Sequence, residues 1–306
     1  MTTCSIGIFV YNEEGNIAQL LESVLQQKLN GVKIGEIVVI SSGSTDKTNK
    51  IVAQFGSKDG RIRLIRQRKR NGKSSAVNLF VEKAKNDILV LAGGDIILTR
   101  DLIENLIAKF KDCEIGMTGA HPIPLNDIKG GLCSFAAHLL WDLHHRISLK
   151  HPKMGEVIAF RKIFKRIPMT SGADEANIEP LIRGQGYKIE YVPDAIIYNK
   201  APTNLSEFIK QRRRINTQHL IVKYEQYYVV STLNPSLIFR ALFSFLRENP
   251  RPKFFLLTPV VVAIEAYSRF LGWWDYKILK KRHTIWDPIV TTKELGVELN
   301  RLGNSI

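Results

Sequence analysis

The sequence has little cysteine, and the few that it has are scattered. Three cysteines, Cys4, Cys113 and Cys133, occur among 306 residues. Their spacing matches neither a metal-ligand set nor a disulfide framework. This pattern argues against a zinc-binding module and against a small disulfide-stapled domain, and it is typical of a protein in a reducing compartment.

Several other signals are missing. The chain has no internal repeat and no low-complexity tract. Its first residues, "MTTCSIGIFVYNEE", lack a basic region followed by a long apolar core. We therefore expect no cleaved signal peptide and interpret this segment as the first strand of a domain.

Two common nucleotide-binding signatures are also absent. No G-x-G-x-x-G follows the first predicted strand, which argues against a dinucleotide-binding domain. The stretch "RNGKSSA" contains Gly-Lys-Ser, but a phosphate-binding P-loop needs a second glycine at position 67, where the chain has Gln67.

The bulk composition is that of a folded protein, with 44% hydrophobic and 24% charged residues. The length suffices for one large α/β domain with an appendage, or for two domains. The unusual figure is the formal net charge of +15. It predicts an anionic partner, which leaves nucleic acid, an acidic membrane face and a phosphorylated substrate open.

The first third of the chain alternates short apolar runs with helical patterns. This alternation predicts βαβ units and a parallel sheet, hence an α/β fold. The predicted strands are 4–10, 36–40, 61–67 and 87–92, and the predicted helices are 16–27, 44–55 and 73–85. Because ligands gather beyond the carboxyl ends of parallel strands, we expect one rim to collect the loops 11–14, 41–46, 68–73 and 93–95.

The later pattern is less regular. We expect a helix over 131–150, a helix followed by two short strands within 173–199, and a strongly basic helix over 206–216. Two apolar helices, 237–247 and 254–274, follow, and a Pro-rich break separates them.

Three groups of residues have both a structural and a chemical explanation. Asp95 after Gly93-Gly94 is either a turn residue or a ligand that holds Mg²⁺ or Mn²⁺ against a diphosphate. The acidic pair Asp174-Glu175 is either a helix start or the source of a catalytic base. The run "QRRRI" (211–215) is either a set of phosphate-binding guanidinium groups or a basic helix near lipid.

Six stretches, taken together, resemble the family 2 glycosyltransferases with the GT-A fold. They cover about residues 4–216 and occur in the family's order: "IFVYNEEGNIAQLLESV", "VVISSGSTDKT", "NGKSSAVN", "ILVLAGGD", "ADEANIEPLIRGQGYKIEYVPDAIIY" and "QRRRI". The resemblance implies an inverting hexosyltransferase that uses a nucleotide-diphosphate sugar, UDP- or GDP-linked, with Mg²⁺ or Mn²⁺.

The resemblance also implies roles for individual residues. Four of them would border the nucleoside: Asn12, Glu13, Ser42 and Asp46. Lys73 would approach the nucleobase or the diphosphate, and Asp95 would bind the metal. Glu175 is favoured as the base, with Asp174 beside it. The diphosphate or the acceptor would contact Gln211, Arg213 and Arg214.

Two positions depart from the family pattern. Gly93 stands where the first Asp of an Asp-x-Asp motif is usual, so one motif carboxylate remains for the metal. Ser41 and Ser42 stand where Asp residues are frequent. The first departure bears on the affinity for the metal, and the second bears on which nucleobase the donor carries.

The tail favours a location at the cell membrane with the catalytic domain on the cytoplasmic face. The stretch 254–274 has about the length that spans a bilayer, but it contains Glu265 and Arg269, which lie four apart and are able to pair. We expect both tail helices to lie in or dip into the inner leaflet, with Trp273, Trp274 and Tyr276 at headgroup depth. A helical hairpin packed on the catalytic domain is the alternative.

The sequence therefore predicts a GT-A catalytic domain over 1–225, with a nucleotide-sugar half (1–115) and an acceptor half (116–225). A membrane-associated helical region would cover 226–306. The predicted partners are the sugar donor, a lipid-linked glycan or polysaccharide acceptor and membrane lipids, without nucleic acid. A basic nucleic-acid-binding protein and a catalytically weakened glycosyltransferase-like scaffold are the alternatives.

Overall fold

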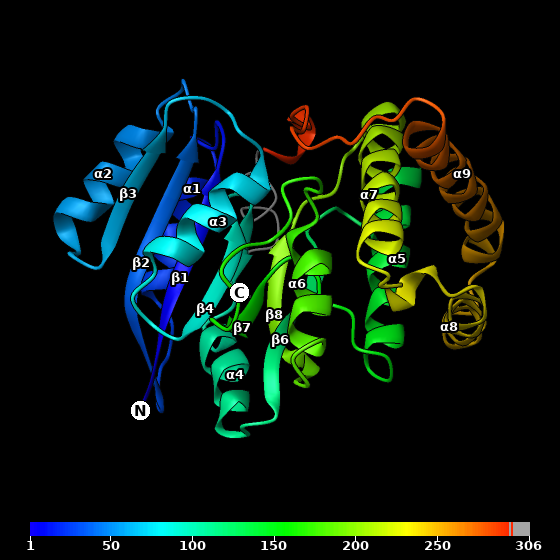
Figure 1. The fold of residues 1–306 in the computed structure, drawn as a ribbon. Coiled ribbons are helices and arrows are strands. Elements are labelled where there is room, and N and C mark those ends of the chain that lie inside the picture. Colours follow the sequence, from blue (N-terminus) through cyan, green and yellow to red (C-terminus); the bar gives the residue numbers. More distant parts are fainter. Residues whose placement is uncertain (294, 296–306) are drawn as a thin grey trace.

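An eight-stranded sheet forms the centre of the computed structural model, which describes residues 1–293 and 295 (Figure 1). The strands lie in the order β3-β2-β1-β4-β7-β6-β8-β5. Their bounds are β1 (Thr2–Val10), β2 (Val32–Ser42), β3 (Ile62–Gln67), β4 (Ile88–Gly93), β5 (Ile96–Leu98), β6 (Ile115–Pro124), β7 (Ile158–Arg161) and β8 (Lys188–Asn199).

The four predicted strands are confirmed and pair in parallel, as β1 with β2 and β4, and β2 with β3. The rest of the sheet is mixed, because β7 runs antiparallel to both of its neighbours, β4 and β6. The prediction of two short strands within 173–199 is wrong. One long strand, β8, keeps its pairing with β6 through a register shift between Gly119 and His121.

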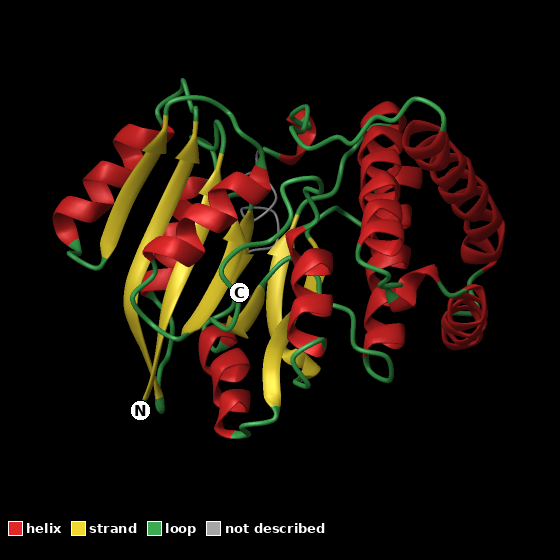
Figure 2. Cartoon of the chain, viewed as in Figure 1, coloured by secondary structure: helices red, strands yellow, loops and turns green. Residues whose placement is uncertain are grey.

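Helices cover both faces of this sheet (Figure 2). One face packs against α1 (Ile17–Leu25), α2 (Thr48–Lys58) and α4 (Leu102–Ala108). The other packs against α3 (Lys73–Lys83) and α6 (Asp174–Arg183). Buried aliphatic side chains on both sides make the sheet a central layer, as an α/β fold requires.

A group of four long helices stands beside the sheet (Figure 1). It comprises α5 (Leu132–Ser148), α7 (Leu205–Glu225), α8 (Pro235–Glu248) and α9 (Pro252–Lys277). An apolar cluster of its own joins α5, α8 and α9, with Phe208 from α7. Short 3₁₀ turns lie at Lys109–Lys111, Ser231–Leu233 and Val290–Thr292.

The start of α2 differs from the prediction. The helix begins at Thr48 with Lys47 as the N-cap residue, four residues later than the predicted 44. Asp46 accepts a hydrogen bond from the Thr48 backbone N–H (3.0 Å) and another from the Glu14 backbone N–H (3.1 Å). Its carboxylate thus joins the loop after β1 to the start of α2.

The two predicted tail helices are confirmed as α8 and α9. Within the described chain, α9 is the one helix long and apolar enough to cross a membrane, with a mean hydropathy of 1.6. Its polar side chains face inward, including Thr258, Glu265, Ser268 and Asp275. Its exposed side chains are mostly large and apolar: Phe255, Leu256, Val260, Val262, Tyr267, Phe270, Trp273 and Trp274.

Candidate active site

The loops that follow the parallel strands lie together at one rim, as predicted. Asn12, after β1, accepts a hydrogen bond from the Thr45 backbone N–H (2.9 Å), and its own backbone N–H donates to Ser44 Oγ (3.1 Å). Asn12 has a φ of 52°, a left-handed conformation that asparagine adopts more readily than most residues. The Arg70 guanidinium from the loop after β3 lies 3.9 Å from the Tyr11 ring centroid.

Two glycines stand at the end of β4, and the second of them is needed for this close approach. A Cβ on Gly94 would lie 2.8 Å from side-chain atoms of both Val10 and Glu13. A Cβ on Gly93 would lie 3.0 Å from Oδ1 of Asp95. Gly94 therefore lets the loop after β4 pack directly on the loop after β1.

A cavity of about 710 Å³ opens at this rim. Seven predicted site residues line it: Glu13, Ser42, Lys73, Asp95, Glu175, Gln211 and Arg214. The other four, Asn12, Asp46, Asp174 and Arg213, are not in its lining. Asn12 and Asp46 instead hold the rim loops together through their side chains.

The acidic pair opens α6 and meets a lysine that opens α3. Lys73 Nζ lies 2.7 Å from Oδ1 of Asp174 and 3.9 Å from Oε1 of Glu175. Burial, together with the neighbouring charge of Asp174, raises the pKa of Glu175 to about 8. A carboxyl group with such a pKa is a suitable proton acceptor near neutral pH.

The predicted arginine run divides between two environments. Arg212 and Arg213 point from α7 toward α9, where Arg212 Nε lies 2.7 Å from Glu265 Oε2, and Arg213 pairs with the fully buried Asp275. Arg212 and Arg214 both line the cavity, and Arg214 lies there against Trp286. The predicted pairing of Glu265 with Arg269 is confirmed at 3.0 Å.

Arg214 is held by an aromatic ring. Its guanidinium carbon lies 3.9 Å from the Trp286 ring centroid, a cation–π contact. Burial lowers the pKa of Arg214 to about 10, and the charges of Asp95 and Glu156 oppose this shift. Its Nε has no hydrogen-bond partner among the described residues, so this donor is available to an anionic ligand in the cavity.

Asp95 lies among other carboxyl groups of the rim. Burial first and the charge of Asp95 second raise the pKa of Glu13 to about 7. The same two causes raise the pKa of Glu156. Yet the described residues contain no cluster of three or more carboxylate, imidazole or thiol side chains that could hold a metal ion. A divalent cation at Asp95 would therefore need oxygen ligands from a bound diphosphate, which is how Mg²⁺ is often held.

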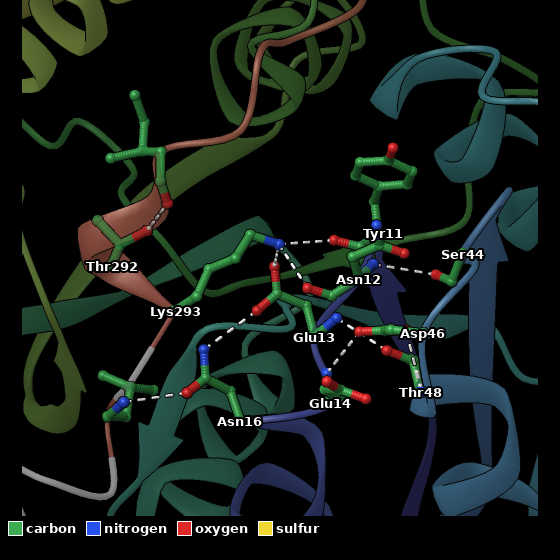
Figure 3. Close-up of polar contacts among 12 residues, drawn as sticks. Tyr11, Asn12, Glu13, Glu14, Asn16, Ser44, Asp46, Thr48, Thr292 and Lys293 are labelled. Atoms are coloured by element: carbon green, nitrogen blue, oxygen red, sulfur yellow. Dashed lines mark hydrogen bonds and ion pairs between the residues drawn. The ribbon is translucent and has the colours of Figure 1, made fainter.

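Sequence reasoning missed the segment 282–293, which we call the C-terminal strap. Lys293 Nζ donates to the backbone oxygens of Tyr11 (2.8 Å) and Asn12 (2.5 Å) and to Glu13 Oε1 (2.7 Å) (Figure 3). Trp286 lies against Gly172, where a Cβ would come within 2.5 Å of its Nε1. No local signal in the sequence marks these contacts, because the partners are as many as 282 residues apart.

A mixed sheet whose parallel strands end above a cavity lined by Glu175, Lys73 and Arg214 is the arrangement of the GT-A fold. Residues 5–128 match the family model described as glycosyl transferase family 2. This segment matches the predicted family, and the predicted fold and enzyme class agree with the comparisons.

Individual relatives resemble parts of the chain. The glycosyltransferase GlyG of Streptococcus pneumoniae is 26% identical over 108 residues, 35% of each chain. A poly-beta-1,6-N-acetyl-D-glucosamine synthase of Staphylococcus aureus is 24% identical over 215 residues, which are 67% of this chain and 51% of the relative. The chain thus matches between about a third and a half of the length of these two curated relatives.

Among solved structures, the chain resembles a mannosyltransferase from Pyrobaculum calidifontis that is in complex with GDP-Man and Mn²⁺. The TM-score is 0.62 at 19% sequence identity, and the match covers 91% of this chain and 88% of the other. At this identity the likeness establishes the fold.

Proposed function

We propose that the chain transfers a hexose, with inversion, from a UDP- or GDP-linked sugar to a lipid-linked or polysaccharide acceptor at the membrane. The observation that carries this proposal is the position of Glu175. Its carboxyl group, with a pKa of about 8, lines the same cavity as Asp95 and Arg214. The proposed base therefore lies in the same cavity as Asp95 and Arg214, the two groups that we assign to the diphosphate.

The nucleoside would lie over the ends of β1 and β2. Glu13 and Ser42 line the cavity there, and Ser42 Oγ donates to Gln67 Oε1 (2.8 Å). Asn12 and Asp46 would act by holding the loops that border the nucleoside. Both UDP and GDP remain candidate carriers, since the mannosyltransferase of similar fold binds GDP-Man.

The diphosphate would lie between Asp95, Lys73 and Arg214. A bound Mg²⁺ or Mn²⁺ at Asp95 would supply positive charge to the phosphate oxygens. The structurally similar mannosyltransferase contains Mn²⁺, which supports this assignment. Because Arg213 is paired with Asp275, we assign diphosphate contact to Arg214 and Gln211.

The chemistry at Glu175 would be a single displacement. An acceptor hydroxyl oxygen forms the new bond to the anomeric carbon while its proton passes to the Glu175 carboxylate. The bond from the anomeric carbon to the diphosphate breaks, and the nucleoside diphosphate leaves with the electron pair. Arg214 and Lys73 would stabilise the negative charge that develops there.

We also propose that α9 contacts lipid, with the catalytic domain on the cytoplasmic face. The outward apolar and inward polar side chains of α9 support this, because such an arrangement suits a hydrocarbon surrounding. Trp273 and Trp274 would lie at headgroup depth. The division into a catalytic domain (1–225) and a helical region (226–306) belongs to the same proposal. The part of the helical region beyond residue 293, apart from residue 295, lies outside the described residues.

A panel of sugar nucleotides tests the proposal. Full-length protein with Mn²⁺ and a membrane extract should release nucleoside diphosphate from at least one UDP- or GDP-hexose and label an acceptor. Glu175→Gln should abolish labelling. An absence of turnover with every donor, in protein that binds nucleoside diphosphate, would favour the weakened scaffold.

A further inference from the structure

The cavity extends past Glu175 into an apolar groove between α5, α8 and α9. Aliphatic and aromatic side chains make up most of its lining there: Ala137, Leu139, Leu140, Leu143, Ile147, Phe208, Ile238, Phe239, Leu242, Val261 and Val262. Glu265 and Arg269 of α9 also line the cavity and pair with each other. The apolar side chains suit a hydrocarbon chain, and Glu265 is already paired with Arg212 and Arg269. The groove and the donor site are parts of one continuous space.

The groove reaches the molecular surface on the apolar side of the helices. Phe239 of α8 and Val262 of α9 line it, and they are 71% and 45% exposed. Val262 belongs to the outward apolar side chains of α9. A chain in the groove would therefore emerge at the surface that we assign to lipid.

A lysine lies where the groove meets the catalytic carboxylates. Lys153 lines the cavity, and the structure gives its ammonium no ion pair or hydrogen bond among the described residues. Its charge is close enough to oppose the rise in the pKa of Glu175 and that of Glu179. A cation held in a partly buried position without a partner favours an anionic ligand.

A histidine lines the same part of the cavity. His144 is 6% exposed, and its ring nitrogens form no close hydrogen bond among the described residues, although the Lys153 backbone lies near enough to counteract the lowering of its pKa. Burial first and the charge of Lys153 second hold the pKa of His144 well below its usual range. The ring is therefore neutral, and one of its nitrogens can donate a hydrogen bond to the same anion.

From this arrangement we infer that the acceptor is a lipid-linked sugar with phosphate between the sugar and the apolar chain. The chain occupies the groove, the phosphate binds Lys153 and His144, and a sugar hydroxyl reaches Glu175. This inference rests on the proposed function and selects the lipid-linked acceptor over the polysaccharide. The bonds made and broken are those of the displacement described above.

The groove offers a matched pair of substitutions. Val262 and Val260 both lie on α9 and are 45% and 43% exposed, but only Val262 is in the cavity lining. With a polyprenyl-diphosphate-linked sugar in vesicles, Val262→Trp should raise the acceptor KM at least tenfold, while Val260→Trp leaves it within twofold. With the same sugar diphosphate on a short soluble chain, both variants should equal wild type. Equal KM values for Val262→Trp and Val260→Trp on the long-chain acceptor would overturn the assignment of the groove.

The phosphate is tested separately. Lys153→Met should raise the acceptor KM at least tenfold, whereas Lys153→Arg, which keeps the positive charge, should have a KM close to that of wild type. Lys150→Met, at an exposed position, is the control and should leave the acceptor KM unchanged. A polyprenyl-linked sugar without phosphate should be a poor acceptor for wild type and insensitive to Lys153→Met. Preferred use of a soluble oligosaccharide, or of a polyprenyl phosphate without sugar, would overturn the inference.

Donor hydrolysis separates this inference from the proposed function. Wild type should release nucleoside diphosphate from the donor in the absence of acceptor, and Val260→Trp, which lies outside the cavity lining, should do so at the same rate. If hydrolysis is intact and the acceptor effects are absent, the inferred acceptor is wrong while the transferase assignment stands. If wild type hydrolyses no donor, the proposed function itself fails.

Discussion

Lys73 Nζ lies 2.7 Å from Asp174 and 3.9 Å from Glu175. The two carboxyl groups are neighbours in sequence, yet they differ in environment. Asp174, 2% exposed, is the close ion-pair partner of the lysine. Glu175 faces the cavity with a pKa of about 8. This asymmetry leads us to assign the base to Glu175 and a positioning role to Asp174.

Glu175→Gln tests that assignment. Because the amide cannot accept the proton, kcat for transfer should fall by about 10² to 10⁴, while the affinity for nucleoside diphosphate stays within about twofold. Transfer rates and calorimetric titration measure the two effects. Glu82→Gln, at an exposed position, serves as the control, and transfer retained in Glu175→Gln would remove Glu175 from the role.

The pH profile tests the charge on Glu175. The base acts when ionised, so kcat/KM should rise with pH through about 8. Asp174→Asn removes a negative charge whose presence disfavours ionisation of Glu175, so it should move this limb to lower pH. A limb that stays in place or moves upward would contradict the coupling.

The same pKa has a consequence for stability. Glu175 has a pKa of about 8 in the folded chain and a lower, ordinary pKa when unfolded, so the folded state binds the proton more tightly. The contribution of Glu175 to stability is therefore complete in acid and is lost as the pH rises toward 8. Glu175→Gln should have a higher Tm than wild type at pH 8.5 and a similar Tm at pH 4. An equal difference at both pH values would argue against the raised pKa.

Substitutions of the adjacent Arg213 and Arg214 should have different effects, the first on stability and the second on donor binding. Arg213→Met leaves the buried Asp275 with only His283, whose Nε2 lies 2.7 Å from it, and should cost about 2–3 kcal/mol of unfolding free energy. Arg214→Met should change stability little and raise the donor KM at least tenfold. Denaturant unfolding and donor kinetics measure the pair, and the reverse pattern would exchange their roles.

The strap should contribute to donor binding through Trp286. Trp286→Ala removes the ring against which Arg214 lies, a contact of about 1–2 kcal/mol, so the donor KM should rise about 5- to 30-fold. Trp286→Phe should retain most of the affinity. Trp273→Ala, on the exposed side of α9, is the control, and a donor KM unchanged in Trp286→Ala would exclude the strap from the site.

The rim was predictable because parallel strands deliver their following loops to one edge, and four apolar runs with polar ends marked those loops. The parallel half of the sheet and the tail helices followed from periodicity. The antiparallel β7 did not, because a four-residue strand between irregular segments carries almost no pattern.

A residue's position at the cavity was predictable where one strand or helix end supplies it, as for Asp95 and Glu175. The arginine run shows the limit, because three consecutive residues on a helix point in different directions and only packing selects Arg214. Lys293 and Trp286 depend on contacts with residues more than 70 positions away in the chain, and nothing in their local sequence indicates such partners.

A divalent cation at Asp95 that helps to hold a diphosphate is central to the proposed function. The most direct measurement is calorimetric titration of wild type and Asp95→Asn with UDP and GDP, each with and without Mn²⁺. We predict that Mn²⁺ raises the affinity of wild type for one of them at least tenfold and has no such effect in Asp95→Asn. Equal affinities with and without Mn²⁺ in wild type, or the same Mn²⁺ effect in both proteins, would contradict it.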